Sequence, residues 1–587
     1  MDKYYSDDRN TQILVALLKA HGIRKIVASP GTTNMALVGS CQHDPWFEMY
    51  SCVDERSAAY VACGLAGESG EPVVLTCTGA TASRNYFPGL SEAYYRKLPI
   101  LAVTFFVSYY GIGNLTPQVI DRSVSPKDTL RYKVELPPVK DAADAEFAEL
   151  KMNTAILELT RNGGGPVHIN LATCGKSFSV KELPAVRVIC RITGKDEFPA
   201  LPKNTKRIAI YVCSHAPWSE AQTKAVDAFC EKNNAVVFCD HTSGYKGKYR
   251  LMYALVAGQD SYASPLCTPD LLIHIGDLSG DYFTYGRMMK AKEVWRVSED
   301  GEVRDTFHKL RYIFDMREQD FFEYYAQNPI SENVPCDEYL NACLAEHDRL
   351  YKKIPEMPFS NDWIAKNVAP RIPGNSVLHL GVSNTMRSWT FFDVPRSVQT
   401  SANVGCRGID GALSTLIGAS LVNPDKLHFG VLGDLTFFYD MNSLGNRHVG
   451  RNLRIMLINN GRGTEFRLYI HPGQRLMGDD ADPYVAAAGH FGNKSPELVK
   501  NYASALGFEY LCASNKDEFA AVIERFLTPE LTEKPMLLEV FTDSKDESDA
   551  LKMLKNLEAS AEGQAKAFAR NILGDSGVKF AKKFLGR

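Results

Sequence analysis

Short β-rich apolar runs that alternate with helix-compatible stretches are the feature that most constrains the fold of this chain. They occur in three successive blocks of the sequence. The first block contains KIVASP (25–30), PVVLTCTG (72–79), LPILAVTF (98–105) and GPVHINL (165–171). The second contains RIAIYVC (207–213), AVVFCD (235–240), DLLIHIGD (270–277) and EVWRVS (293–298), and the third contains SVLHLG (376–381), LHFGVLGD (427–434), LRIMLINN (453–460) and MLLEVFTD (536–543). This alternation predicts an α/β fold with three doubly wound parallel-sheet domains.

Two passages of different composition separate these blocks. Residues 177–204 are irregular and contain several prolines, whereas residues 337–353 are rich in charge and compatible with a helix. A chain of 587 residues also exceeds the roughly 250 to 300 residues at which single cores stop growing. We therefore predict a first domain over 1–185, a middle domain over 186–345, a third domain over 346–550 and a helical tail over 551–587. The tail ends in basic residues that we interpret as a solvated helix face or a subunit contact, namely Lys579, Lys582, Lys583 and Arg587.

Composition and charge exclude several classes of protein. Hydrophobic residues make up 45% of the chain and charged residues 23%, and the net charge is −3, which is typical of a globular protein without a bias toward nucleic acid. The apolar run at 13–18 is too short for the core of a signal peptide or for a membrane span. The 14 cysteines form no CxxC pair and no zinc-type cluster, so we interpret them as small buried hydrophobes. We expect a cytoplasmic protein with no nucleic-acid partner and no membrane insertion.

The segment over 431–461 carries the strongest functional signal. An apolar strand ends in Gly433-Asp434, a helix with small residues follows, and a second apolar strand ends in Asn459-Asn460. The spacing leaves room for one helix and one parallel strand, so both strand ends reach the same carboxyl edge of the sheet. Open α/β sheets bind their ligands at that edge.

Oxygen atoms at this edge match the ligand preferences of Mg²⁺. That ion takes octahedral oxygen ligation and usually sits between a few protein oxygens, water and phosphates. Asp434, Asn460 and a backbone carbonyl near Arg462 supply such oxygens. Thr436 and the N-terminus of a helix expected to begin near Phe437 would meet a diphosphate, because free N–H groups and the helix dipole favour anions there.

This pattern of Gly-Asp, a spacer and Asn-Asn resembles the diphosphate-binding signature of thiamine-diphosphate enzymes. Leu435 stands where these enzymes usually have a second glycine, a departure that one subfamily shares. The resemblance implies cofactor contacts from Gly433, Asp434, Leu435, Thr436 and Asn460, and Mg²⁺ contacts from Asp434, Asn460 and Arg462. A structural alternative stays open, in which Asp434 caps a helix and Asn-Asn-Gly forms a turn.

A second motif is DERSAAYVACGLAGESGEPVVLTCTGATASRN (54–85), in which Glu55 lies just before an Ala-rich helix. Thiamine catalysis needs a carboxylic acid against the ring nitrogen of the aminopyrimidine, because the tautomer that it stabilises lets the amino group deprotonate the thiazolium carbon. An apolar pocket raises the pKa of a carboxyl group and suits this sharing of a proton. Glu55 matches that glutamate of the family. The alternative is an exposed acid at a helix start, where acids are also favoured.

A third stretch, SANVGCRGIDGALST (401–415), resembles the segment that passes under the cofactor. Family members place a bulky aliphatic side chain there to hold the two cofactor rings in a V, and Ile409 matches it. Backbone groups from Gly405 to Gly408 would meet the pyrimidine. The alternative is a Gly-rich loop before an ordinary buried helix.

Within the superfamily, the chain resembles the menaquinone-pathway synthases that add a decarboxylated 2-oxoglutarate unit to isochorismate. The segments that carry this resemblance, in the same order, are SPGTTN (29–34), DERSAAY (54–60), CTGATASRN (77–85), GNLTPQVID (113–121), GVSNTMR (381–387), GIDGALST (408–415) and GDLTFFYDMN (433–442). Gln118, Ser383 and Arg387 match substrate-side positions of that family, and the resemblance implies catalytic or substrate-binding roles for them. It also implies a homodimer or homotetramer with active sites between subunits.

Most of the arginines that would hold the very acidic substrates of those synthases are missing here. Basic positions of the family are replaced by Thr33, by TFFVSYY (104–110), by Val404 within Asn403-Val404-Gly405 and by Asp281-Tyr282. Losing a hydrogen bond to a charged group costs about 1.5–3 kcal/mol. Arg84, Arg407 and Arg467 are new basic candidates, each of which we interpret first as a salt-bridged structural arginine.

The sequence therefore favours a carboligase built on the plan of the menaquinone synthases but with altered substrates. We expect a 2-oxo acid donor with one carboxylate or none besides the group lost as carbon dioxide, with Arg387 as the one matched clamp. The acceptor is expected to be neutral or a sugar-like carbonyl compound, in a pocket lined by aromatic residues such as Phe105, Phe106, Tyr109 and Phe466.

Three other functions stay open. They are a non-oxidative 2-oxo acid decarboxylase, the synthase reaction itself, and an inactive cofactor-binding subunit. The chain has no adjacent pair of histidines of the kind that simple pyruvate decarboxylases use. Its middle block shows no GxGxxG fingerprint, so a dinucleotide or flavin is not indicated.

Overall fold

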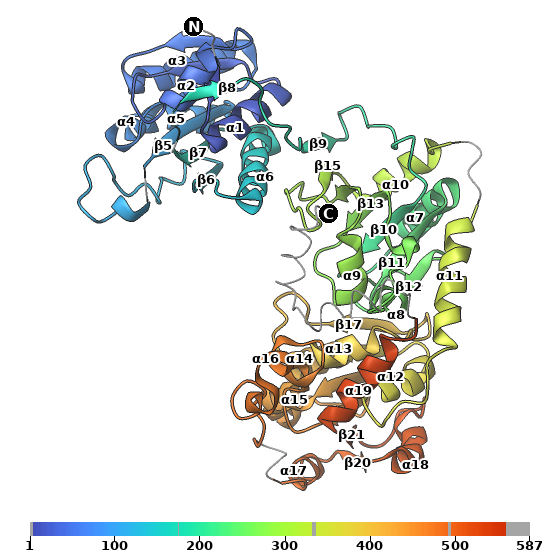
Figure 1. Ribbon diagram of the computed structural model, residues 1–587. Helices are drawn as coiled ribbons and strands as arrows, with labels where there is room; N and C mark the ends of the chain where they lie inside the picture. Colours follow the sequence, from blue (N-terminus) through green and yellow to red (C-terminus); the bar gives the residue numbers. More distant parts are fainter. Residues whose placement is uncertain are drawn as a thin grey trace. The chain divides into compact units, whose positions relative to one another are not determined.

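The computed structural model describes residues 4–107, 109–173, 175, 177–331, 336–490 and 495–558. These residues divide into two compact units (Figure 1). Unit 1 comprises residues 1–196, 300–306 and 310–315, and unit 2 comprises residues 197–299, 307–309 and 316–587. Residues 559–587, which include most of the expected helical tail and all four of its basic residues, lie outside the described residues. Ser108, within the TFFVSYY segment, also lies outside them.

Unit 1 is built around one parallel sheet. Its strand order is β3 (Glu48–Ser51), β2 (Lys25–Ala28), β4 (Val73–Thr76), β5 (Ile100–Phe106), β7 (Val167–Ala172) and β6 (Tyr132–Leu136). Its helices are α1 (Arg9–Ala20), α2 (Met35–Gln42), α3 (Glu55–Ser69), α4 (Ala80–Arg84), α5 (Phe87–Arg96) and α6 (Ala142–Glu158). A short antiparallel pair of β1 (Tyr5–Ser6) and β8 (Phe178–Val180) joins the two ends of this segment.

Successive side chains along a strand point to opposite faces of the sheet, and this explains why helices cover both faces. Ile26 packs into the cluster that contains α1 and α6, whereas its neighbour Val27 packs into the cluster that contains α3 and α5. Val74 and Leu75 divide between the two clusters in the same way. Full burial of such a side chain contributes about 1.5–3 kcal/mol, so both faces must be covered. The doubly wound α/β arrangement predicted from the sequence is confirmed.

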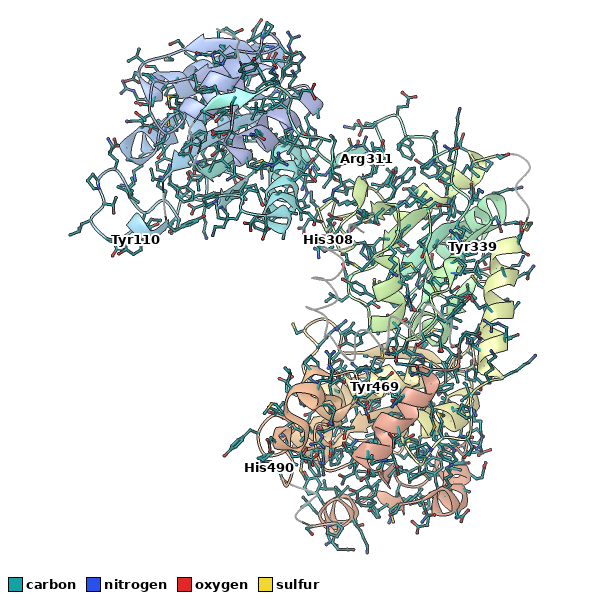
Figure 2. All side chains as sticks on the ribbon, in the orientation of Figure 1. Tyr110, His308, Arg311, Tyr339, Tyr469 and His490 are labelled. Atoms are coloured by element: carbon teal, nitrogen blue, oxygen red, sulfur yellow. The ribbon has the colours of Figure 1, made fainter. Side chains whose placement is uncertain are left out.

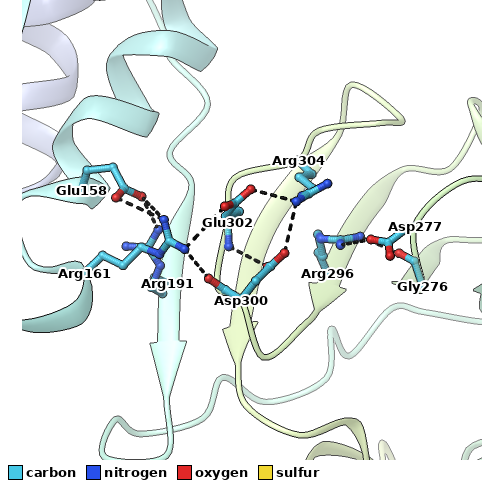
Figure 3. Close-up of polar contacts among 9 residues, drawn as sticks. All are labelled: Glu158, Arg161, Arg191, Gly276, Asp277, Arg296, Asp300, Glu302 and Arg304. Carbon is cyan, nitrogen blue, oxygen red and sulfur yellow. Dashed lines mark hydrogen bonds and ion pairs between the residues drawn. The ribbon is translucent and has the colours of Figure 1, made fainter. Parts of the chain in front are cut away.

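A later part of the chain returns to complete unit 1. Strand β9 (Cys190–Thr193) pairs in parallel with β15 (Leu310–Asp315). Figure 3 shows polar contacts nearby, among them the hydrogen bond that Arg191 donates to the carboxylate of Glu158 at 3.1 Å. Arg191 also donates to the carbonyl of Gly301 at 2.9 Å. Arg161 donates to the carbonyl of Asp300 at 2.6 Å. Charge-assisted hydrogen bonds therefore bind residues 300–306 to the N-terminal segment of the same unit.

Unit 2 contains two further parallel sheets. In the middle sheet, neighbouring strands follow the order β12 (Arg250–Met252), β11 (Ala235–Cys239), β10 (Ile208–Val212), β13 (Leu271–Ile275) and β14 (Glu293–Val297). The C-terminal sheet has the order β17 (Gln399–Ala402), β16 (Val377–Leu380), β18 (His428–Gly433), β19 (Leu453–Asn459), β21 (Met536–Phe541) and β20 (Glu509–Ala513). The boundaries at 185/186 and 345/346 stay predictions.

The helices of unit 2 cover these sheets and connect their strands. They are α7 (Glu220–Asn233), α8 (Ala254–Ala257), α9 (Tyr282–Met288), α10 (Glu318–Gln327), α11 (Glu338–Tyr351), α12 (Asn361–Val368), α13 (Asn384–Trp389), α14 (Ala412–Val422), α15 (Asp434–Asp440), α16 (Pro472–Met477), α17 (Leu498–Ala505), α18 (Lys516–Phe526) and α19 (Ser544–Leu554). Helix α11 occupies the segment that the sequence predicts as a helical connection, and its Tyr339, labelled in Figure 2, donates a hydrogen bond to the carbonyl of Leu266 at 2.5 Å.

Two further observations concern expectations from composition. Among the described residues, no helix combines the length and the apolar character that crossing a bilayer requires. Most of the described cysteines are buried, but Cys336, Cys406 and Cys512 are exposed and therefore do not act as core hydrophobes.

Candidate active site

The ends of β18 and β19 bring the predicted metal ligands together in unit 2. The parallel register pairs Gly433 with Ile458, so Asp434 and the residues after β19 leave the sheet at the same edge. Helix α15 begins at Asp434, three residues before the predicted start near Phe437, because Gly433 already has an extended backbone that serves as the cap. The sequence prediction of this helix start was therefore wrong, and the acid belongs to the first helical turn.

Asp434 is a buried carboxyl group held by backbone N–H groups. Its Oδ1 accepts a hydrogen bond from the N–H of Leu435 at 2.8 Å. Burial raises the pKa of Asp434 to about 7, although the N–H groups of Leu435, Gly461 and Arg462 act in the opposite direction. A bound cation would favour the charged form of such a group, because it replaces the lost solvation.

The side chain of Asn460 has the property expected of a metal ligand. Its Oδ1 is buried and has no hydrogen-bond partner in the described structure. A buried acceptor that lacks a partner costs about 1–3 kcal/mol, so its presence calls for an explanation. The carbonyl of Arg462 accepts one hydrogen bond, from the N–H of Thr464 at 2.8 Å, and keeps a second lone pair. This oxygen donor set of Asp434, Asn460 and the Arg462 carbonyl fits Mg²⁺.

Glu547 positions Asn460 and was missed by the sequence reasoning. It comes from α19, is fully buried, and accepts hydrogen bonds from the N–H of Asn361 at 3.1 Å and from the amide of Asn384 at 3.4 Å. Burial raises the pKa of Glu547 to about 7, and a hydrogen bond with the Asn460 side chain acts against this rise. A partner behind a ligand fixes the ligand's orientation, here with the Asn460 oxygen left free. No sequence motif distinguishes Glu547, because it lies in the first turn of a helix, where acidic residues are common.

One cavity collects most of the predicted residues of unit 2. It has a volume of about 140 Å³. The predicted residues that line it are Ser383, Ile409, Gly433, Asp434, Leu435, Thr436, Asn460, Arg462 and Phe466. Gly405 and Gly408 are not among its lining residues and belong to the loop between β17 and Ile409. The cavity therefore joins the predicted metal ligands, the predicted aliphatic support and one predicted substrate-side residue.

Ser383 holds an uncommon backbone conformation at this cavity. It lies between β16 and α13 with φ 66° and ψ −125°. Residues other than glycine rarely adopt this combination of backbone angles, and such strain costs about 1–3 kcal/mol. The conformation persists because the surrounding structure imposes it, which is typical of residues whose direction matters for binding or chemistry.

Arg387 is already paired with an acid, which the sequence analysis did not foresee. It lies on α13, and its two terminal nitrogens donate to the two carboxylate oxygens of Glu465, one of them at 2.7 Å. The side chain of Arg387 is 8% exposed and that of Glu465 is 20% exposed. Arg387 is therefore paired within the chain in this structure, and its expected role as a carboxylate clamp stays a prediction.

The three new arginine candidates also have partners within the chain. Arg407 donates to the carbonyl of Ser279 at 2.6 Å and stacks over the ring of Tyr282 at 4.3 Å. Arg84 donates to the carbonyl of Asp121 at 3.2 Å.

Among the described residues, Arg467 is the one of the three that forms a salt bridge. It pairs with Asp482 at 3.0 Å and with Asp479 at 2.5 Å. The interpretation as a salt-bridged structural arginine thus holds for Arg467, whereas Arg84 and Arg407 use neutral carbonyl partners.

Unit 1 carries a second cavity that contains Glu55. This residue opens α3, whose N-cap Asp54 accepts a hydrogen bond from the N–H of Ser57 at 2.7 Å. Glu55 is half-buried and lines a cavity of about 290 Å³ together with Thr33 and Gln118. Thr33, which replaces a basic residue of the family, shares a 2.6 Å hydrogen bond with Thr78. This cavity joins the predicted activating carboxyl group to a predicted substrate-side residue.

Gln118, like Ser383, has a positive φ. Its φ is 61°, a value that favours glycine. Phe105 and Phe106 line the cavity beside it, as expected from the sequence. Tyr109 is not among the lining residues, is 43% exposed and packs against the ring of Phe106 at 4.5 Å, so its expected role as a pocket residue is not supported.

Arg122 lines this cavity and was missed by the sequence reasoning. Its guanidinium donates to Thr104 Oγ1 at 3.0 Å, to the carbonyl of Phe105 at 2.9 Å and to Asn170 Oδ1 at 2.9 Å. Burial lowers the pKa of the Arg122 guanidinium. These three acceptors are neutral, and the only available signal was an arginine four residues after Gln118.

Two further residues that the resemblance places at basic positions of the family, Val404 and Asp281, are buried. Val404 is 5% exposed. Asp281 is the N-cap of α9, with its carboxylate accepting the N–H of Phe283 at 2.7 Å. Burial raises the pKa of Asp281 to about 6, with the neighbouring Asp240 acting in the same direction. Neither position supplies a positive charge.

Comparison with known families matches both halves of this arrangement. Residues 9–125 match the family described as thiamine pyrophosphate enzyme, N-terminal TPP binding domain. Residues 381–540 match the family described as thiamine pyrophosphate enzyme, C-terminal TPP binding domain. The first match contains Glu55 and Gln118, and the second contains Asp434 and Asn460.

Similar proteins extend over nearly the whole chain. A 2-succinyl-5-enolpyruvyl-6-hydroxy-3-cyclohexene-1-carboxylate synthase of Bacteroides thetaiotaomicron is 33% identical over 577 residues, which cover 93% of this chain and 98% of that protein. Synthases of the same name from Bacteroides fragilis and Porphyromonas gingivalis are 31% and 29% identical, with coverage of this chain of 93% and 94% and of their own lengths of 98% and 97%. The chain therefore belongs to the thiamine-pyrophosphate-dependent enzyme family that includes these synthases, and its cofactors are thiamine diphosphate and Mg²⁺.

Proposed function

We propose that this enzyme is a carboligase that decarboxylates a 2-oxo acid donor and joins the remaining acyl unit to an acceptor, with substrates that differ from those of the named synthases. Thiamine diphosphate supplies the carbanion chemistry that such a reaction needs. The observation that carries the proposal is the unsatisfied Asn460 oxygen, which lies beside buried Asp434 in a cavity also lined by Ile409 and Ser383.

Residues of this chain have separate tasks in the proposal. Asp434, Asn460 and the carbonyl of Arg462 hold Mg²⁺, which offsets the charge of a diphosphate. Ile409 would support the cofactor, and backbone groups of the preceding loop, including Gly405 and Gly408, would contact its pyrimidine.

Glu55 is the proposed proton partner of the cofactor. Its carboxyl group holds a proton at the ring nitrogen of the aminopyrimidine and thereby favours the reactive tautomer. Gln118 and Ser383 contact the substrates, and their strained backbones fix the directions of their side chains.

The substrate assignment rests on charge. Thr33, Val404 and Asp281 replace basic positions, and Arg387 is neutralised by Glu465. Burying unpaired carboxylates is costly, so a site with few free cations disfavours substrates that carry several acids. We propose a donor with one carboxylate or none besides the group lost as carbon dioxide, and an acceptor that is neutral or a sugar-like carbonyl compound.

The named synthase reaction is the second candidate, and the names of the relatives favour it. A simple 2-oxo acid decarboxylase is a third, and product analysis with and without an acceptor separates it from a carboligase. An inactive cofactor-binding subunit is the least favoured, because Glu55, Asp434 and Asn460 are all retained and an inactive scaffold does not need them.

A homodimer or homotetramer with active sites between subunits is also part of the proposal. Helix α14 carries no charged residue, and its Leu421 is 44% exposed and its Val422 is 85% exposed. On α3, Tyr60 and Val61 are 47% and 43% exposed. Neighbouring exposed apolar side chains often mark a protein–protein interface, so a second copy is expected to cover these side chains. Sedimentation that finds an active monomer would contradict the assembly.

The direct test of function is a product screen with the purified protein, thiamine diphosphate and Mg²⁺. Isochorismate with 2-oxoglutarate is compared with pyruvate-type donors and neutral carbonyl acceptors, and the Glu55→Gln variant is the inactive control. Coupling of a pyruvate-type donor to a neutral acceptor supports the proposal. Efficient coupling of 2-oxoglutarate to isochorismate instead establishes the synthase reaction and refutes the altered-substrate assignment.

A further inference from the structure

We infer that Glu465 is a specificity-determining residue: its pairing with Arg387 turns the wall of the 140 Å³ cavity into a neutral surface that selects 2-oxo acid donors with an uncharged tail. The inference rests on the proposed function, because it concerns the donor of that reaction. It goes beyond that function by naming the residue that sets the charge of the donor subsite.

Glu465 lies at the cavity itself. It belongs to the short 3-10 turn over Thr464–Arg467, which follows the loop of Asn460. The cavity is lined by Glu465 together with Asp434, Ile409 and other residues. A single carboxylate at this place would add negative charge beside Asp434 and a bound diphosphate. Arg387 removes this repulsion by accepting Glu465 as its counterion.

The geometry of the Arg387–Glu465 pair uses the hydrogen-bonding groups of both side chains. Two parallel N–H···O hydrogen bonds join the guanidinium of Arg387 to the carboxylate of Glu465, and both side chains are largely buried. Such bidentate pairs are geometrically specific and strong, because both partners are charged and matched in shape. A substrate carboxylate that reaches for Arg387 must first displace Glu465 and leave it buried without a partner.

Other charged groups near Arg387 do not take over the role of Glu465. Burial raises the pKa of Asp362 to about 8, so this acid is largely protonated near neutral pH and does not neutralise the arginine. Lys555 is also nearby, but it pairs with Asp260 at 2.9 Å. Glu465 is therefore the carboxylate, among the described residues, that balances Arg387.

Arg387 itself is not among the lining residues of this cavity, and the cation that does line it among the described residues is likewise paired. Arg462 lines the cavity and its guanidinium bonds to Asp482 at 2.5 Å. Within the described part of the chain, no cation that lines this cavity is left without an acid. A second carboxylate on a donor thus finds no positive partner here, whereas an alkyl or hydroxylated tail meets Phe466, Val382 and the neutral pair.

Binding of two donor analogues that cannot be decarboxylated tests this inference. Acylphosphonates mimic 2-oxo acids but cannot lose carbon dioxide, so their affinity is measured by calorimetry without turnover. One analogue carries a methyl tail and the other a carboxyethyl tail, and the protein is loaded with thiamine diphosphate and Mg²⁺. We expect the wild type to bind the methyl analogue at least about tenfold more tightly, as one unpaired charge implies.

The Glu465→Gln variant releases the positive charge of Arg387 while keeping the size of the side chain. We expect it to shift the ratio of the two affinities by about tenfold or more toward the carboxyethyl analogue. Glu509→Gln is the matched control, since Glu509 forms the same bidentate pair with Arg525 outside the cavity. This control is expected to leave the ratio unchanged.

The outcomes separate the inference from the proposed function. Tighter binding of the carboxyethyl analogue by the wild type overturns the inference, and this measurement needs no variant. A wild type that binds the methyl analogue, with a ratio that stays the same in Glu465→Gln, overturns the inference and leaves the proposed function standing. A wild type that binds cofactor but neither analogue overturns both.

Discussion

Gly433 and Ile458 are register partners on neighbouring parallel strands, and this pairing places the two predicted metal ligands at one edge of the C-terminal sheet. Asp434 follows the first strand directly, and Asn460 lies two residues beyond Ile458. Because parallel neighbours end on the same side, a helix between the strands separates the ligands in sequence while the sheet joins them in space.

Replacing Asp434 with alanine is expected to weaken Mg²⁺-dependent binding of thiamine diphosphate by about 100-fold or more, because the ion loses its charged ligand. Calorimetric titration of the cofactor with and without Mg²⁺ measures the effect. Asp440→Asn, on the same helix, is the control, since Asp440 bonds to Ser414 and not to the cavity. Unchanged cofactor affinity in Asp434→Ala would remove this residue from the metal site.

Replacing Glu55 with glutamine is expected to separate cofactor binding from cofactor activation. The cofactor still binds, because the metal ligands lie in unit 2, but hydrogen–deuterium exchange at the thiazolium carbon slows by about 10²–10⁴-fold, the usual contribution of a positioned acid or base. NMR of quenched samples follows the exchange. Wild-type exchange in the variant would show that another group activates the cofactor.

Asp362 is expected to make the stability of the enzyme depend on pH. Burial, followed by the charge of Glu547, raises the pKa of Asp362 to about 8, well above the ordinary value of about 3.9. Between these values the folded state keeps a proton that the unfolded state releases. Stability therefore falls as pH rises through this window, by about 1.4 kcal/mol per pH unit at most.

Asp362→Asn removes this dependence, because an amide mimics the protonated acid. Thermal unfolding at pH 5, 6, 7 and 8 is expected to show a Tm advantage of the variant that grows with pH. Asp425→Asn, at an exposed position, serves as the comparison. A constant difference between Asp362→Asn and the wild type across this range would contradict the assignment.

The strained backbone of Ser383 leads to a prediction about stability. Glycine adopts φ 66°, ψ −125° without steric cost, whereas alanine keeps the strain, and both lack the hydroxyl group. We expect Ser383→Gly to be more stable than Ser383→Ala by about 1 kcal/mol, after the entropic cost of glycine is deducted. Urea unfolding curves give the difference. Equal stabilities would mean that this backbone can relax.

The sequence predicted the buried strands of this fold well, but it did not predict a polar strand at the edge of a sheet. Every apolar run named in the three blocks contains a strand, because continuous burial leaves a continuous apolar signal. Strand β17, with the sequence QTSA, was not predicted. It lies at an edge of its sheet and is partly exposed, so it carries no apolar pattern.

The same contrast applies to the candidate site. Asp434, Asn460 and Ile409 were predicted from local motifs, and one cavity contains all three. The pairing of Arg387 with Glu465 was not predictable in this way. It joins α13 to a turn that is 78 residues later in the sequence, and only the packing of the sheet brings them together.

The return of residues 300–315 to unit 1 limits how the protein can be dissected. A fragment that ends at residue 196 would lack β15, and β9 would become an unpaired edge open to other chains. The same cut would remove Asp300 and Gly301, whose carbonyls accept hydrogen bonds from Arg161 and Arg191. The N-terminal unit is thus discontinuous in sequence, and limited proteolysis at one bond is not expected to release it as a soluble, folded piece.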